Sequence, residues 1–306
     1  MSVNVQNLTK SYDRQQAVDS ISFTAKKGQI LGFLGPNGAG KSTTMKIITC
    51  FLPQTSGSVS VCGHDTQKSP AEVKRLIGYL PETNPLYEEM YVREYLEFIA
   101  RLHKLADAGK KVREMVEKTG LGREQHKPIR ALSKGYRQRV GLAQAMIHDP
   151  EVLILDEPTS GLDPNQLVDI RNLIKEAGRE KTVIFSTHIM QEVQALCDRV
   201  LIINQGQIVA DDPIDQLEQR ISGMRTIRVV FDETVEAALL KTIPGVTGFE
   251  QQGQKAFLVH SSAGIDLRPT LFRFAVSQGF TLLELSPVSH SIEDIFQQLT
   301  KSSIAN

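Results

Sequence analysis

The sequence has 306 residues, 41% of them hydrophobic, so it can bury one large core and a second, smaller one. Thirty-five basic residues balance thirty-five acidic ones, and this neutral total provides no general attraction to nucleic acid or to an anionic membrane. The N-terminus lacks a basic and apolar signal segment, and no run of 18 apolar residues occurs. We therefore expect a chain that does not span a bilayer.

Three scattered cysteines, Cys50, Cys62 and Cys197, lie in apolar or helical surroundings. Their spacing is not that of a zinc site or a disulfide framework, so it favours reduced, buried thiols. Reduced thiols are typical of the cytoplasm, and we expect the chain to be located there.

Residues 1–34 alternate strand-like runs with turns, which predicts a small antiparallel sheet. A glycine-rich segment follows the apolar run 30–34 and precedes the apolar residues 44–48. It consists of Gly35, Pro36, Asn37, Gly38, Ala39, Gly40, Lys41, Ser42 and Thr43. The order strand, loop and helix with this spacing predicts a P-loop.

The P-loop pattern indicates a phosphate site. Its glycines allow backbone N–H groups to turn toward one anion, and the new helix adds its positive end. Lys41 is then expected to reach the β- and γ-phosphates of ATP, and Ser42 to bind Mg²⁺. The alternative is a glycine turn that happens to precede Lys-Ser, and the strand and helix on either side disfavour it.

An apolar run over residues 77–80 predicts a strand that leads to Glu82, and a helical block follows. Apolar side chains recur there at helical spacing and predict a core stripe rather than a ligand site. They are Tyr91, Val92, Tyr95, Leu96, Ile99 and Leu102.

The apolar residues 152–155 predict a buried parallel strand with Asp156 at its carboxyl end. This is where a carboxylate associated with Mg²⁺ belongs in an open α/β sheet. Glu157 follows directly and is the candidate general base. The alternative for Glu157 is an ordinary acid at a strand end.

Strand and helix patterns alternate again after Asp156, with strands expected at residues 182–186, 200–203 and 207–210. Residues 211–220 are interpreted as a helix and a linker. A new unit begins at residue 225 with the order β-α-β-β-α-β and a closing helix over residues 292–300, which predicts a small split-βαβ domain. It shows no catalytic group, and its His260 and His290 are interpreted as surface residues.

Together these residues resemble the nucleotide-binding subunit of ATP-binding cassette (ABC) transporters over residues 1–215. Residues 132–136, Leu-Ser-Lys-Gly-Tyr, are similar to the cassette signature. The resemblance implies that Tyr12 stacks on adenine, that Ser133 and Gly135 contact ATP, that Asp163 of the D-loop communicates across a dimer, and that His188 contacts the γ-phosphate.

The resemblance also implies the architecture and the partners. We expect an α/β fold: a P-loop NTPase core with an antiparallel β-subdomain and a helical subdomain, plus a small C-terminal α+β domain. The domains are 1–215, a linker at 216–224, and 225–306. ATP and Mg²⁺ are the implied cofactors. The implied partners are a second copy of the chain in an ATP-sandwich homodimer and separate transmembrane permease subunits at the cytoplasmic face of the membrane, with no nucleic acid.

Two positions depart from the family pattern. Glu82 stands where a Gln that binds Mg²⁺ is usual, and Lys134-Gly135-Tyr136 replaces Gly-Gly-Gln. Glu82 with the residues after it, and the C-terminal extension, look most like the exporter branch, including gliding-motility-associated subunits of bacteria. Four apolar residues are interpreted either as a contact with the membrane subunits or as core: Pro85, Leu86, Tyr87 and Met90.

A second class of function is a soluble cassette ATPase that acts as a clamp on ribosomes or DNA. Such proteins usually carry two cassettes or long coiled coils, whereas this sequence has one P-loop, no heptads and no net charge. A nucleotide-binding module without turnover is the third class, and Glu157 disfavours it.

Overall fold

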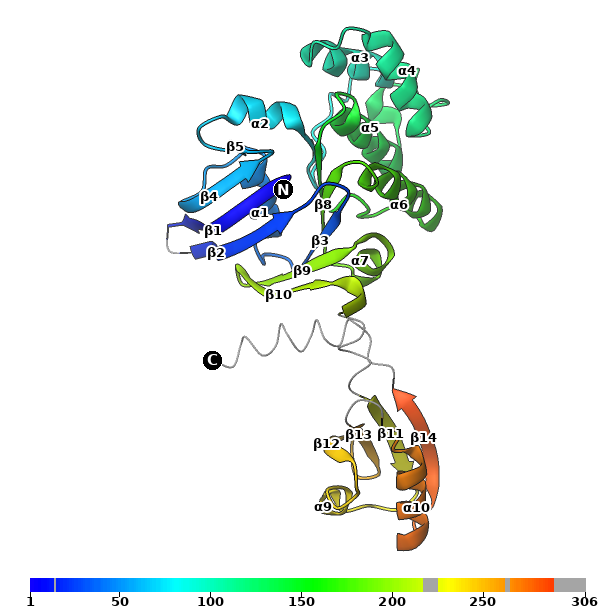
Figure 1. Ribbon diagram of the computed structural model, residues 1–306. Helices are drawn as coiled ribbons and strands as arrows, with labels where there is room; N and C mark the ends of the chain where they lie inside the picture. Colours follow the sequence, from blue (N-terminus) through cyan, green and yellow to red (C-terminus); the bar gives the residue numbers. More distant parts are fainter. Residues whose placement is uncertain (14, 217–224, 262–264, 289–306) are drawn as a thin grey trace. The chain divides into compact units, whose positions relative to one another are not determined.

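The computed structural model describes residues 1–306 except 14, 217–224, 262–264 and 289–306. The chain divides into two compact units, residues 1–214 and residues 215–306, and each is described by itself. Figure 1 shows the first unit as two sheets with a group of helices at one end.

The N-terminal sheet of the first unit has four strands in the order β2-β1-β4-β5. They are β1 (Val3–Tyr12), β2 (Gln15–Ala25), β4 (Ser56–Val61) and β5 (His64–Asp65). All neighbouring pairs are antiparallel. This confirms the antiparallel sheet predicted from the first 34 residues, although two of its strands come from later in the chain.

The second sheet has six strands in the order β10-β9-β3-β8-β7-β6. They are β3 (Ile30–Leu34), β6 (Ile77–Leu80), β7 (Val152–Asp156), β8 (Thr182–Thr187), β9 (Arg199–Asn204) and β10 (Gln207–Pro213). Only β10 is antiparallel to its neighbour among these strands. Every residue of β3, β7 and β8 is buried, which explains their continuous apolar runs.

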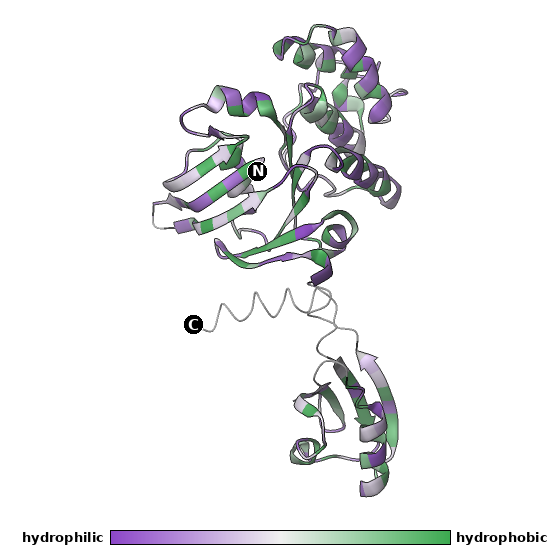
Figure 2. Cartoon of the chain, in the orientation of Figure 1, coloured by the Kyte–Doolittle hydropathy of each residue, from purple (hydrophilic) through white to green (hydrophobic). Residues whose placement is uncertain are grey.

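Helices cover this sheet and form a separate group beyond it (Figure 1). The helices near the sheets are α1 (Lys41–Ile48), α2 (Pro70–Leu76), α6 (Pro164–Gly178) and α7 (Met190–Leu196). The helical group contains α3 (Val92–Leu102), α4 (Ala108–Lys118), the short 3₁₀ helix η1 (Ile129–Ala131) and α5 (Lys134–Met146). In Figure 2 the strands carry much of the hydrophobic colour, while the outer helices show hydrophilic bands.

The predicted apolar stripe of α3 is correct in its middle and wrong at its ends. Val92, Tyr95, Leu96 and Ile99 are buried in the core of the helical group. Tyr91 is 52% exposed and Leu102 is 66% exposed. The first residue precedes the helix and the second ends it, and helical spacing alone does not show where the covering elements stop.

The prediction of a helix from residue 211 is wrong at its start. β10 continues to Pro213 because Asp211, Asp212 and Pro213 pair with β9. Arg199 of β9 forms an ion pair with Asp211, so this polar stretch is held in the sheet by charge as well as by backbone hydrogen bonds. Residues 217–220 of the predicted segment lie outside the described residues.

The second unit has the strand and helix order predicted from the sequence. Its elements are β11 (Arg225–Phe231), α9 (Ala237–Leu240), β12 (Val246–Gln251), β13 (Ala256–Ser261), α10 (Arg268–Gln278) and β14 (Leu282–Val288). The sheet order is β12-β13-β11-β14, and every pair is antiparallel. Strand β13 therefore lies between β11 and β12, as a split-βαβ unit requires. The expected closing helix at 292–300 lies outside the described residues.

Two smaller expectations change. His260 is half-buried and not a free surface residue, since its Nδ1 lies 2.8 Å from the Thr226 hydroxyl; His290 lies outside the described residues. All three cysteines are free, but only Cys197 is buried. In the described part of the chain, we find no helix with the length and apolar character needed to cross a membrane.

Two histidines stack where the helical group meets the parallel sheet. The rings of His103, which follows α3, and His148, which follows α5, are 4.0 Å apart and nearly parallel. His148 donates from Nε2 to the carbonyl of Ile77 at the start of β6, at 3.1 Å. Its Nδ1 is buried without a hydrogen-bond partner among the described residues, so the neutral ring is the form that the fold accepts.

We expect His148 to make the fold less stable in acid. Its pKa is lowered from 6.5 to about 4, first by burial and then by His103. The unfolded chain therefore takes up a proton below about pH 6.5 that the folded protein refuses until about pH 4. The free energy of unfolding should decrease as the pH falls through this window, by up to about 1.4 kcal/mol per pH unit.

Urea unfolding at several pH values measures this dependence in the wild type and in His148→Gln, whose amide can still donate to Ile77. The variant should show a shallower dependence, and His126→Gln, a change at an exposed residue, should keep the wild-type slope. Equal slopes in the wild type and His148→Gln would contradict the assignment.

Candidate functional site

The glycine-rich loop lies between β3 and α1, in the order predicted from the sequence. Two of its glycines are required by close packing. A Cβ atom on Gly35 would lie 2.4 Å from the carbonyl oxygen of Ile203, and one on Gly40 would lie 2.5 Å from that of Ala17. Gly40 also has a φ of 108° directly before the first turn of α1, a conformation that favours glycine. The loop therefore presents its backbone closely against the sheet.

The ammonium group of Lys41 is turned back into this loop. Its Nζ donates to the carbonyls of Gly35 at 2.8 Å and Pro36 at 3.2 Å, and it lies 3.8 Å from a carboxylate oxygen of Glu157. Burial lowers the pKa of Lys41, while the nearby charges of Glu157, Asp156 and Glu82 raise it. A buried cation held by two carbonyls and one carboxylate is a site that phosphate oxygens can complete.

Asp156 and Glu157 leave the carboxyl end of β7 in different directions. Asp156 is buried and accepts a hydrogen bond from the Ser186 hydroxyl of neighbouring β8. Glu157 has a φ of 51°, which is uncommon outside glycine. Its N–H donates to the carbonyl of Ser186 and lies 3.1 Å from the Ser186 hydroxyl oxygen. This turn separates the two carboxylates, so that they serve different places in the site.

Glu157 and His188 are joined by hydrogen bonds. Nδ1–H of His188 donates toward both carboxylate oxygens of Glu157, at 2.9 and 3.0 Å. Burial raises the pKa of Glu157, and His188 and Lys41 oppose that change. A raised carboxylate pKa suits a general base, because a group with a pKa nearer the working pH accepts a proton more readily.

A cavity of about 380 Å³ brings most of the expected phosphate and catalytic residues together. It is lined by Ala17, Asn37, Gly38, Gly40, Lys41, Ser42, Thr43, Glu82, Glu157, Ser160 and His188. Ala17 comes from β2 and Ser160 from the segment after β7, and no motif in the sequence marks either. Ser186 ends the predicted strand 182–186, and nothing in the sequence pattern shows its hydrogen bond to Asp156.

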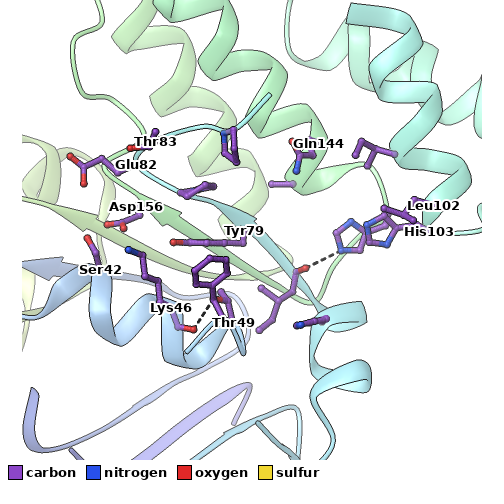
Figure 3. A pocket seen from close by; sticks show the side chains of 18 residues that line it. Ser42, Lys46, Thr49, Tyr79, Glu82, Thr83, Leu102, His103, Gln144 and Asp156 are labelled. Atoms are coloured by element: carbon purple, nitrogen blue, oxygen red, sulfur yellow. Dashed lines mark hydrogen bonds between the residues drawn. The ribbon is translucent and has the colours of Figure 1, made fainter. Parts of the chain in front are cut away.

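The residues expected to hold Mg²⁺ line a second, adjoining cavity of about 550 Å³. Ser42, Glu82 and Asp156 share it with Tyr79 and with side chains of α3 and α5 (Figure 3). Hydroxyl and carboxylate oxygens are the ligands that Mg²⁺ prefers, so the donor set fits this ion. In the described part of the chain, no group of three or more His, Cys, Asp or Glu side chains could hold a metal. The fit of this site to Mg²⁺ therefore depends on phosphate oxygens that complete the coordination shell of the ion.

The remaining expected residues line neither cavity. Tyr12 is 43% exposed at the end of β1, with the Lys10 ammonium 5.0 Å above its ring. Ser133 caps α5 by accepting from the N–H of Tyr136 at 3.4 Å. Asp163 caps α6 in the same way, accepting from Gln166 at 3.0 Å. Neither of the two cavities described above is lined by both the signature segment and the phosphate loop.

The signature segment instead packs against the segment that contains Asp163. A Cβ on Gly135 would collide with the Gln166 side chain of α6, and one on Gly161 would lie 2.4 Å from Nζ of Lys134. Both contacts join the start of α5 to the start of α6. The signature therefore contacts residues on both sides of Asp163 in the chain.

Comparison with known proteins agrees with this geometry. The family model described as ABC transporter matches residues 18–160. The ABC transporter ATP-binding protein YdbJ of Bacillus subtilis (strain 168) is 36% identical over 97% of this chain and 95% of its own. The bacitracin transport ATP-binding protein BcrA of Bacillus licheniformis is 33% identical over 97% of this chain and 96% of its own. A solved structure, the ATP-binding subunit of an ABC transporter, has a TM-score of 0.67 at 28% identity and covers 72% of this chain and 93% of its own.

We predict that Glu157→Gln binds ATP normally but hydrolyses it about 10²–10⁴-fold more slowly, which is the usual contribution of a positioned base. The amide keeps the size of the side chain and cannot accept the proton. Phosphate release at saturating ATP measures the effect. Glu151→Gln, at an exposed carboxylate directly before β7, is the control and should stay within twofold of the wild type. Near-normal hydrolysis by Glu157→Gln rules out this role.

Proposed function

The chain belongs to the ABC transporter family as its ATP-binding and ATP-hydrolysing subunit, and from this premise we propose that two copies close around two ATP molecules to drive separate membrane subunits. The proposal rests on one observation: the residues expected to bind ATP lie in two separate places in the chain's fold. Lys41, Glu157 and His188 surround the phosphate cavity, whereas Ser133 and Gly135 lie at the start of α5 and line neither cavity.

A dimer with a two-fold axis would bring the two groups of residues together. If two copies meet head to tail, each phosphate loop faces the Ser133 and Gly135 of the other copy, and one kind of chain forms two equivalent sites. ATP then lies between the copies and its binding holds them together. The contacts of Lys134 with Gly161 and of Gly135 with Gln166 connect the signature to Asp163, so each copy senses the nucleotide on the other.

The side chains around the cavity have separate parts in hydrolysis. Ser42 and Asp156 would hold Mg²⁺ together with the phosphates, and the ion would supply positive charge to neutralise the transferred group. Lys41 donates hydrogen bonds to phosphate oxygens in place of the backbone carbonyls of Gly35 and Pro36. Glu157 orients and deprotonates the attacking water. His188, now bonded to Glu157, holds the γ-phosphate and keeps the Glu157 side chain in place. Tyr12, at the end of β1, is the proposed contact of the adenine ring.

The larger cavity is the proposed contact with the membrane subunits. Its mouth has exposed apolar side chains on both sides: Phe51, 70% exposed, after α1, and Leu102, 66% exposed, at the end of α3. Lys46 and Lys74 line the same cavity. Of the four apolar residues expected at this contact, Leu86 is buried in the helical core. Pro85 and Tyr87 are exposed and Met90 is half-buried. Pro85 and Tyr87 therefore remain candidates for the contact with the membrane subunits.

The direction and place of transport follow by similarity. We propose export, at the cytoplasmic face of the plasma membrane, with no nucleic acid as partner. The bacitracin transport protein matches over 97% of this chain, a span that includes most of the second unit. The finer likeness to gliding-motility-associated subunits depends on Glu82, its neighbours and the second unit, and stays a prediction. The ribosome or DNA clamp is not supported, since the two relatives compared above carry transporter names.

We predict that Ser133→Arg blocks closure of the dimer while each chain still binds ATP. An arginine at the start of α5 adds bulk and charge at the surface that meets the other copy's nucleotide. Light scattering after gel filtration with ATP, in the slowly hydrolysing Glu157→Gln background, measures the dimer. Ser133→Thr keeps the capping hydroxyl and is the control. A normal ATP-dependent dimer in Ser133→Arg contradicts the head-to-tail arrangement.

We also predict that Leu102→Asp weakens the contact with the membrane subunits and leaves the chemistry intact. A charge at the mouth of the larger cavity opposes burial of the apolar surface there. In cells of the source organism, the fraction of the chain that sediments with membranes should fall several-fold, while the ATPase rate of the purified chain stays within twofold. Val168→Asp, at an exposed apolar residue of α6, is the control. An unchanged membrane fraction in Leu102→Asp would argue against this contact.

A further inference from the structure

The hydroxyl of Tyr79 is buried and has no hydrogen-bond partner in the described part of the chain. Tyr79 lies in β6 opposite Ile154 of β7, near the carboxyl ends of both strands. A buried hydroxyl without a partner destabilises a fold by about 1–3 kcal/mol. Such a group in a native protein needs a reason, and a hydrogen bond to a bound water or ion is one of the common ones.

A second buried tyrosine near the same cavity does have a hydrogen-bond partner for its hydroxyl. Tyr95 of α3 is buried as well, and its hydroxyl donates to the side-chain oxygen of Gln144 on α5 at 2.5 Å. Gln144 lines the same cavity as Tyr79. The fold thus supplies a partner for one buried phenol beside this cavity and leaves the other without one.

The unpartnered hydroxyl faces the expected metal site. In Figure 3 the oxygen end of Tyr79 points toward the side of the cavity where Ser42 and Asp156 lie, away from His103. Glu82 lines the same cavity. The carboxylate of Asp156 at the end of β7 already accepts a hydrogen bond from Ser186 of β8. Tyr79 belongs to β6, which pairs with β7 on the side opposite β8.

The charges around Tyr79 keep its hydroxyl a donor. Burial raises the pKa of Tyr79 well above its usual value of 10, and the negative charges of Asp156 and Glu82 raise it further. The phenol therefore stays protonated at any working pH. A water beside it would have the hydroxyl and a carboxylate as partners, and the cavity of about 550 Å³ has room for several waters.

We propose that Tyr79 is a positioning residue for the metal: its hydroxyl donates a hydrogen bond to a water bound to the Mg²⁺ that Ser42 and Asp156 hold with ATP. The inference rests on the proposed function, because it needs the nucleotide and the ion in the site. Mg²⁺ keeps several waters when it binds to proteins and phosphates, and partners of such ligands orient them and tighten the binding of the metal. Among the described residues the same hydroxyl has no other partner.

The test compares metal affinity in variants that lack single hydroxyl groups. Tyr79→Phe and Tyr95→Phe are made in the full chain with Glu157→Gln, so that ATP is bound and turnover is slow. Mn²⁺ replaces Mg²⁺, and electron paramagnetic resonance measures free Mn²⁺ during titration of the ATP-bound protein. We expect Tyr79→Phe to weaken Mn²⁺ binding about 3–10-fold, as the loss of one hydrogen bond would. ATP affinity measured in excess chelator should not change.

Stability separates this role from a structural one. Tyr79→Phe removes an unsatisfied group, so its midpoint of urea unfolding without nucleotide should equal or exceed that of the parent. Tyr95→Phe loses a satisfied hydrogen bond, so its midpoint should fall while its Mn²⁺ affinity stays unchanged. Equal Mn²⁺ affinities in Tyr79→Phe and its parent overturn this inference alone. A parent that binds no Mn²⁺ in the presence of ATP overturns the proposed function and this inference together.

Discussion

The structure depends on one buried cluster of charges at the carboxyl ends of the parallel strands. Lys41 and Glu157 are each almost completely buried and lie 3.8 Å apart, and Asp156 is held beside them by Ser186. Burying such groups is costly unless each has partners, and the loss of one partner leaves an unpaired charge in the interior. β3, β7 and β8 must therefore end together, because each supplies or supports a member of the cluster.

The same constraint explains why the cluster suits phosphate. Two backbone carbonyls and the Glu157 carboxylate surround the Lys41 ammonium, and His188 is hydrogen-bonded to Glu157. The two carbonyls are acceptors that the oxygens of a polyanion could replace. Phosphate oxygens are stronger acceptors for the Lys41 ammonium than backbone carbonyls are. Burial raises the pKa of Glu157, although His188 and Lys41 oppose that change.

Two of the buried polar atoms without a partner among the described residues lie at the boundary between the parallel sheet and the helical group. They are the Tyr79 hydroxyl and Nδ1 of His148, and both residues line the larger cavity. A boundary with unsatisfied groups is held less tightly than one with complete packing. The helical group carries the signature segment, so this boundary lies between that segment and the phosphate loop.

The sequence by itself determined the parts of this protein that depend on near neighbours in the chain. The loop 35–43, the strand that ends at Asp156 and the β-α-β-β-α-β order of the second unit follow from local spacing and alternation, because a run of buried residues must match the period of its own element. Only the tertiary structure decided which groups meet. The inward turn of Lys41, the Ser186–Asp156 bond, the stacked His103 and His148, the continuation of β10 through Pro213 and the exposed ends of the α3 stripe all depend on segments distant in the chain. A side chain's partners and burial are set by what packs on it from elsewhere, and no local period carries that information.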